Sequence, residues 1–123
     1  MNDGAGGDVV LIVTGGRKLA VPTVRVREVS AASMVTPVPT APPPVAGLTQ
    51  LRGQILPVID LGEESPRTPK PGDPLVVVEL GPVRAALVCD QVVGVSGDAG
   101  DVPILDVGAV FDALRGKVAQ VGA

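Results

Sequence analysis

Short valine-rich runs separated by proline and glycine are the feature that most constrains how this chain can fold. The 123 residues include 16 Gly and 13 Pro, and hydrophobic residues make up 46% of the chain. Valine supplies most of this apolar volume, and its stiff, branched side chain suits a pleated strand. Glycine and proline interrupt regular structure. The sequence therefore predicts one domain made of short strands and turns rather than long helices.

The first 29 residues predict a hairpin and a further short element. Residues 8–14 predict a strand, and Gly15-Gly16 is a typical two-residue turn. Residues 18–24 form the returning strand, in which Pro22 indicates a sheet edge or a bulge because proline cannot donate to a ladder. Residues 24–29 alternate in character and predict a strand, with a short helical turn as the alternative.

The middle of the chain contains the clearest strand pair. Five prolines in residues 36–44 predict an extended, polyproline-like strap rather than a ladder, with low-complexity disorder as the alternative. Residues 48–61 then predict a hairpin that turns at Arg52-Gly53 or one residue later, with an edge-type proline at Pro57. The polar residues 62–74 predict a loop, and this loop is the natural break between two lobes.

The last third predicts a second hairpin and a helix. Residues 75–80 and 83–89 form the hairpin, which residues 91–95 continue before a turn-rich loop. Asp106 is a good N-cap for a helix over residues 107–118, and Gly116 offers an earlier end for that helix.

Composition argues against several classes of function. The net charge of −3 and the near absence of aromatics, with Phe111 alone, exclude a nucleic-acid surface. No apolar run approaches the ~20 residues of a membrane span, and the start of the chain does not resemble a signal peptide. With no histidine and no tyrosine, the chain lacks the commonest general base and metal ligand. We therefore expect no enzyme, no metal and no cofactor.

Three residues still invite a chemical interpretation. Cys89 is the single cysteine, which fits a reducing cytoplasm, and its apolar neighbours favour a packing thiol over a nucleophile. Glu28 and Arg52 lie 24 residues apart, on either side of the proline strap. They would form an ion pair if those two elements pack together. From the residues alone, two solvated surface charges are the simpler interpretation.

A longer stretch of the sequence resembles a known family. The runs VRVREV (residues 24–29) and APPPVAGLTQLRGQILPVIDL (residues 41–61) resemble the CheW-type coupling domain of bacterial chemosensory systems. The most specific part is the pattern G-x-x-x-L-R-G-x-I-x-P-V-x-D-L, which begins at Gly47. The run LVVVELGPVRAALVCDQVVGV and the closing ILDVGAVFDAL are also similar to that family, so the resemblance covers roughly residues 8–115.

The resemblance implies an all-β fold of two small SH3-like β-barrels with a short C-terminal helix. Residues 8–118 would form one CheW-like domain, preceded by a flexible tail over residues 1–7. The first lobe would span about residues 20–62. The second would span about residues 75–105 and include the N-terminal strand and the C-terminal helix.

The resemblance also implies a function and a set of contact residues. Members of the family are cytoplasmic, non-catalytic adaptors that link the tip of methyl-accepting chemoreceptors to the regulatory domain of the histidine kinase CheA, itself CheW-like. Glu28 and Arg52 fall on the acidic and arginine positions that interact in the family. The positions implied to bind partners, including other CheW-like proteins, are Val26, Gly47, Leu48, Thr49, Arg52 and Val93.

One departure from the family pattern stands out. After Gly94-Val95 only SGDAGDVPI precedes the closing Leu-Asp, where the family has a further strand-loop-strand stretch. The second barrel is therefore expected to be abbreviated, as in Frz-type CheW-like proteins. We expect receptor binding to survive while one kinase contact is weakened or lost. Two alternatives remain: a small-ligand sensor that uses the open barrel near Asp90, Gln91 and Ser96, and an enzyme that depends on Cys89.

Overall fold

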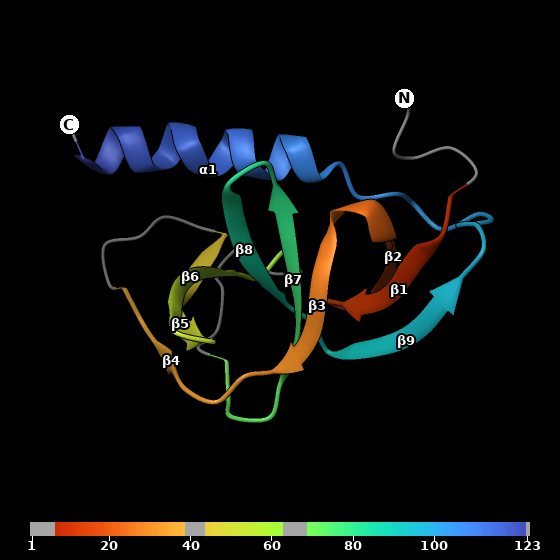
Figure 1. Ribbon diagram of the computed structural model, residues 1–123, viewed down its shortest axis with the longest axis horizontal. Coiled ribbons are helices and arrows are strands. Elements are labelled where there is room, and N and C mark those ends of the chain that lie inside the picture. The colour runs from red at the N-terminus through yellow and green to blue at the C-terminus, as the bar shows by residue number, and fades with distance from the viewer. Residues whose placement is uncertain (1–6, 39–43, 63–68, 123) are drawn as a thin grey trace.

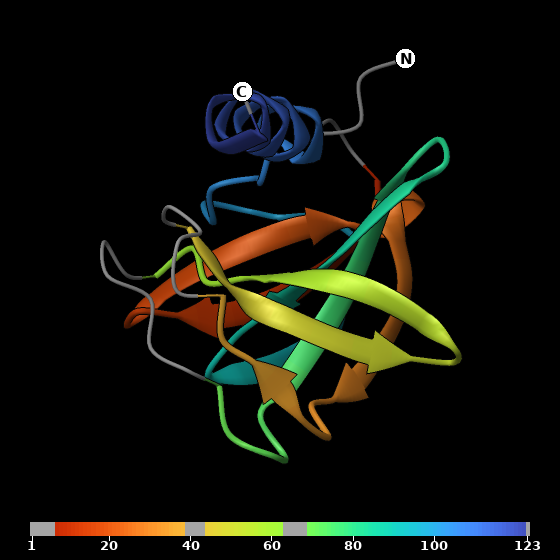
Figure 2. The same ribbon diagram turned by 90° about the vertical axis from the view of Figure 1, so that its left-hand side faces the viewer.

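Two β-sheets and a C-terminal helix make up the computed structural model, which describes residues 7–38, 44–62 and 69–122, with side chains up to Leu114 (Figure 1, Figure 2). The predicted tail over residues 1–7 lies outside these residues except for Gly7, which is exposed. The elements are β1 (Val9–Thr14), β2 (Arg17–Pro22), a 3-10 turn η1 (Thr23–Arg25), β3 (Val26–Ala31), β4 (Val35–Thr36), β5 (Val45–Leu51), β6 (Gln54–Ile59), β7 (Pro74–Leu80), β8 (Val83–Val88), β9 (Gln91–Ser96) and α1 (Val107–Gly122).

The strands divide into sheets of unequal size. One sheet has the order β3-β7-β8-β6-β5-β4, and the other has the order β2-β1-β9. Neighbouring strands are antiparallel except for β6 and β8, which are parallel. The predicted class, an all-β fold with a C-terminal helix, is confirmed.

The core follows from the valine-rich strands. The run 75–78 of β7 is buried on both faces of its sheet, as expected for an unbroken apolar segment. One face joins the three-stranded sheet and the helix in a common core, and the other face forms a second core beneath β4 and β5. The common core contains Val10, Ile12, Val21, Ile59, Val76, Val78, Ala85, Leu87, Cys89, Val107, Phe111 and Leu114.

Two of the predicted hairpin turns form at the expected residues. Gly15 and Gly16 have φ values of 58° and 76°, as a twisted two-residue hairpin requires. The β5–β6 turn is formed by Arg52 and Gly53, whose φ values are 51° and 79°. Residues 24–29 combine the two interpretations, since η1 ends at Arg25 and β3 begins at Val26.

Some local expectations were wrong. Pro57 was expected at a sheet edge, but β6 lies between β5 and β8. Proline is tolerated there because the ladder to β8 begins only at Val58. The proline strap was expected to form no ladder, yet its first residue, Thr36, pairs with Leu48. The strand Gln91–Ser96 pairs with β1 instead of continuing the β7–β8 hairpin.

The helix begins as predicted and ends later. The Asp106 carboxylate accepts a hydrogen bond from the Ala109 N–H at 3.0 Å, which caps the first turn. Val107, Phe111 and Leu114 are buried against the core, so three side chains at helical spacing anchor the helix. The expected end at residue 118 and the alternative end at Gly116 were both too early, because helical backbone continues to Gly122. No helix within the described residues is long and apolar enough to cross a membrane.

Sheet membership differs from the expected grouping into lobes. Residues 75–105 were expected in the second lobe, but β7 and β8 pair with β3 and β6. A strand pair buried on both faces must lie between two layers, which places it at the centre of the molecule. Within residues 75–105, β9 is the strand that belongs to the sheet of β1 and β2. The boundaries of the two lobes stay a prediction.

Candidate functional site

Glu28 and Arg52 form an ion pair between β3 and the β5–β6 turn. The Arg52 Nε–H donates to Oε1 and Oε2 of Glu28, at 3.1 Å in each case. One nitrogen thus serves both oxygens of the carboxylate. The Arg52 side chain is 78% exposed, whereas that of Glu28 is 22% exposed. The contact therefore orients an arginine that remains accessible from solution.

A small hollow of about 240 Å³ surrounds this ion pair. Arg84 carries further polar contacts at this hollow: its Nε donates to Glu79 Oε2 at 3.2 Å and its Nη1 donates to Gln54 Oε1 at 2.6 Å. The hollow is lined by Arg27, Glu28, Leu51, Arg52, Gln54, Leu56, Val77 and Arg84. This part of the surface presents a charged and hydrogen-bonding face.

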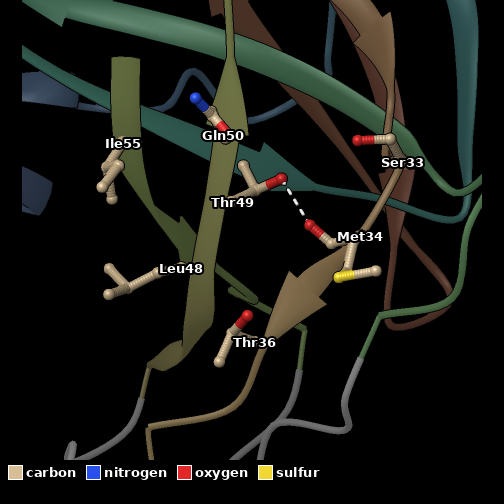
Figure 3. A pocket seen from close by; sticks show the side chains of 7 residues that line it. All are labelled: Ser33, Met34, Thr36, Leu48, Thr49, Gln50 and Ile55. Atoms are coloured by element: carbon tan, nitrogen blue, oxygen red, sulfur yellow. Dashed lines mark hydrogen bonds between the residues drawn. The ribbon is translucent and has the colours of Figure 1, made fainter. Parts of the chain in front are cut away.

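A second hollow, of about 400 Å³, lies along β4 and β5 (Figure 3). Figure 3 shows Thr49 pointing toward Met34, whose carbonyl oxygen accepts a hydrogen bond from Thr49 Oγ1 at 2.7 Å. This bond ties β5 to the segment before β4. The hollow is lined by the uncharged residues Ser33, Met34, Thr36, Leu48, Thr49, Gln50 and Ile55.

Large apolar side chains are exposed around this second hollow, which we call the apolar hollow. Met34 is 73% exposed, Ile55 is 71% exposed and Leu48 is 38% exposed. Three apolar side chains on one uncharged surface favour a protein partner over a charged ligand. Thr49, by contrast, is buried and serves to hold the hollow's wall.

Gly47 shapes the same wall from within β5. It is buried and has a φ of 156°, and it follows a shift in the β5–β6 register. A Cβ atom at this position would lie 2.5 Å from the Thr36 carbonyl oxygen and 2.8 Å from Val35 Cγ1. Only glycine lets β4 approach β5 this closely, so Gly47 acts on the surface through backbone packing.

The remaining predicted contact residues lie elsewhere. Val26 is half-buried and packs against the common core, so it offers little free surface. Val93 is 47% exposed on β9, in the other sheet. Leu11 faces Gly94 and Ile12 faces Val92, which makes Val93 the extra residue of a β-bulge. The six positions implied to bind partners are therefore spread over two sheets. They do not form one continuous surface patch.

Sequence reasoning missed several residues of these surfaces. Met34 and Ile55 line the apolar hollow, while Gln54 and Arg84 belong to the polar network. The exposure of Ile55 could have been predicted. Successive side chains of a strand point to opposite faces, and its neighbour Leu56 is buried. Arg84 gave a partial signal, because the predicted hairpin sets it opposite Glu79, but nothing local pointed to its contact with Gln54, 30 residues away.

The acidic side chains, Cys89 and the segment near Asp90 bear on the alternative interpretations of the sequence. No group of three or more His, Cys, Asp or Glu side chains there could hold a metal ion. Burial, reinforced by the nearby charge of Asp90, raises the pKa of the Cys89 thiol to about 11, so the thiol is protonated at neutral pH. Neither hollow includes Asp90, Gln91 or Ser96, the residues considered for a ligand sensor.

The fold and its surfaces define a small β-sheet protein that offers contact faces. Residues 8–98 match the sequence model of the CheW-like domain, and the chain belongs to this family. It is 36% identical over 101 residues to the protein FrzA of Myxococcus xanthus, an alignment that covers 76% of this chain and 58% of FrzA.

A solved structure supports the same assignment. The crystal structure of the scaffolding protein TtCheW from Thermoanaerobacter tengcongensis superposes with a TM-score of 0.63 at 26% sequence identity. The match covers 74% of this chain and 61% of TtCheW. The chain thus spans about three fifths of the length of the relatives it matches.

Proposed function

We propose that this protein is a non-catalytic adaptor of a bacterial chemosensory complex in the cytoplasm. In this proposal it binds the cytoplasmic tip of methyl-accepting chemoreceptors and modulates their coupling to the regulatory domain of a CheA-type histidine kinase. Membership of the CheW-like family supports this role. The similarity to FrzA and to a scaffolding protein supports it further.

The observation that carries the proposal is the Glu28–Arg52 ion pair. It joins residues 24 positions apart that the resemblance to the family implies as an interacting pair, and it leaves an accessible guanidinium on the surface. An exposed arginine is a frequent anchor in protein interfaces, because it offers several donors in a fixed geometry. We propose that Arg52 contacts a partner while Glu28 orients it.

The apolar hollow supplies the second element of the proposed interface. Leu48 and Ile55 present apolar surface beside uncharged hydrogen-bonding groups, and this combination is typical of the centre of a protein contact. Thr49 and Gly47 fix the strands that carry these side chains. We propose that this sheet keeps a complete partner-binding face.

The three-stranded sheet is where coupling to the kinase would differ. It contains only β2, β1 and β9 among the described residues, and the further strand-loop-strand stretch that the resemblance implies after Val95 is not found in this sequence. We propose that the kinase contact on this side is weakened or lost, while the contact on the six-stranded sheet is kept. Other CheW-like proteins would then share the complex with this chain.

Assembly of receptor, kinase and adaptor tests the proposal. Receptor-tip fragments and CheA are combined either with this protein or with a full-length CheW, and the bound amounts are measured after sedimentation. We expect this protein to sediment with receptors while it recruits less kinase per receptor than full-length CheW. Equal kinase stoichiometry with the two adaptors would show that no kinase contact has been lost, and failure to sediment with receptors would refute the adaptor role.

A further inference from the structure

The outer edge of β9 is left open in the three-stranded sheet. β9 pairs with β1 along one side, and Figure 1 shows it at the lower right margin of the molecule. The opposite edge of the same sheet is partly covered, because Ala20 of β2 donates to the Pro103 carbonyl and accepts from the Leu105 N–H, both at 2.8 Å. Among the described residues, no strand or loop covers β9 in this way.

Val95 shows that the apolar face of β9 is also uncovered. Residues directly opposite each other in an antiparallel pair point to the same face of the sheet. Val95 is opposite Val10, and Val10 is opposite Val21. Val10 and Val21 are 4% and 0% exposed in the core, whereas Val95 is 71% exposed. The face of the sheet that is buried at Val10 and Val21 therefore continues onto β9, where it is exposed at Val95.

The open edge carries few of the features that prevent strands from pairing with other chains. Gln91–Ser96 contains no charged residue and no proline, which are the usual guards of an edge strand. The bulge at Val93 disturbs the middle of β9, but the segment from Gly94 to Gly97 lies beyond it. Pairing is thus best accommodated around Val95.

We propose that a second copy of this chain covers the edge, with the two β9 strands antiparallel about a two-fold axis at Val95. This register places the two exposed valines opposite each other, and such β-branched pairs stabilise a sheet. Asp98 of one copy then faces Val92 of the other, so no carboxylates are opposed. An identical strand is therefore compatible in charge, and the two-fold register makes the contact self-complementary. This inference is independent of the proposed adaptor function.

The contact is small, so the dimer should be weak. One added strand buries less than the roughly 1,200–2,000 Å² of a stable interface. We therefore expect a concentration-dependent equilibrium in which the mass of the 12.3 kDa chain rises toward twice that value. Analytical ultracentrifugation of the full chain over a wide concentration range measures this mass directly.

Two lysine substitutions locate the contact. Val95→Lys places a charge in the proposed interface and should weaken the dimer by roughly tenfold or more. Val24→Lys is the matched control, because Val24 is 69% exposed but lies in η1, outside β9. Both sites are exposed, and circular dichroism verifies that each variant is folded. A constant mass of 12.3 kDa at every concentration, a dimer unaffected by Val95→Lys, or equal weakening by the two variants would overturn the proposal.

Discussion

Arg52 donates its Nε–H to both carboxylate oxygens of Glu28 while its own backbone has a left-handed φ of 51°. That conformation costs a residue of this kind roughly 1–2 kcal/mol. An exposed ion pair contributes at most about 1 kcal/mol, so the pair does not offset the cost. An arginine held where glycine or asparagine would fit better is a local conflict of the kind found at functional sites.

Charge reversal tests the pairing of these two residues. Arg52→Glu should reduce receptor-tip binding about tenfold, because it removes the proposed anchor and places two carboxylates together. Adding Glu28→Arg in the same chain should restore part of that loss, as measured in a double-mutant cycle. Arg17→Glu, at an exposed arginine of β2, is the control for the change in net charge. A double variant that binds no better than Arg52→Glu alone would show that the pair is not coupled.

Arg52→Asn separates the binding role of the side chain from its structural role. Asparagine adopts the left-handed conformation at a smaller but nonzero cost, so this partial relief of strain should roughly balance the lost ion pair. We expect the free energy of unfolding to stay within about 0.5 kcal/mol of the wild type while receptor-tip binding falls. Urea denaturation and a binding titration measure the two effects. A large loss of stability with unchanged binding would assign Arg52 a purely structural role.

Gly47→Ala tests the close approach of β4 and β5. The added Cβ would lie 2.5 Å from the Thr36 carbonyl oxygen, so β4 must move away. We expect a loss of about 1–3 kcal/mol in the free energy of unfolding, as is usual for overpacking. Gly97→Ala is the control, since no atom lies within 4 Å of a Cβ there. Equal stability of the two variants would show that the contact is not tight in solution.

The buried thiol of Cys89 predicts a pH effect. Its pKa rises from 9.0 to about 11 in the folded protein, so the folded state holds this proton more tightly than the unfolded chain does. The contribution of Cys89 to stability is therefore complete below pH 9 and is lost as the pH rises toward 11.

Comparison with Cys89→Ala isolates this contribution, because every other titrating group is common to the two proteins. The difference in the free energy of unfolding between wild type and variant should fall between pH 9 and 11 in the direction that disfavours the wild type. A difference that is constant over this range would show that the thiol does not titrate with a raised pKa.

Local features of the fold could be predicted from the sequence. The turn at Gly15-Gly16 and the cap at Asp106 depend on residues within a few positions of each other, and both formed as expected. The pairing of β9 with β1 and of β8 with β6 depends on contacts between distant segments. Short valine-rich strands resemble one another, so their pattern does not specify a neighbour.

The candidate site, like the fold, could be predicted from the sequence only in part. The residues alone favoured solvated charges at Glu28 and Arg52, and only the resemblance to the family pointed to their ion pair. Met34 and Ile55 reach one hollow because β4, β5 and β6 lie side by side, an arrangement that no local pattern specifies. Side-chain exposure of this kind depends on the assembled sheet.

Separate titrations with the two proposed partners test the central claim most directly. Isothermal calorimetry measures the Kd of this protein for a receptor-tip fragment and for a CheA regulatory domain, with a full-length CheW as the reference. The adaptor proposal predicts a receptor Kd close to that of the reference and a kinase Kd at least about tenfold weaker, a loss of about 1.4 kcal/mol. Binding of the kinase domain as tight as the reference, or no binding of the receptor tip, would contradict it.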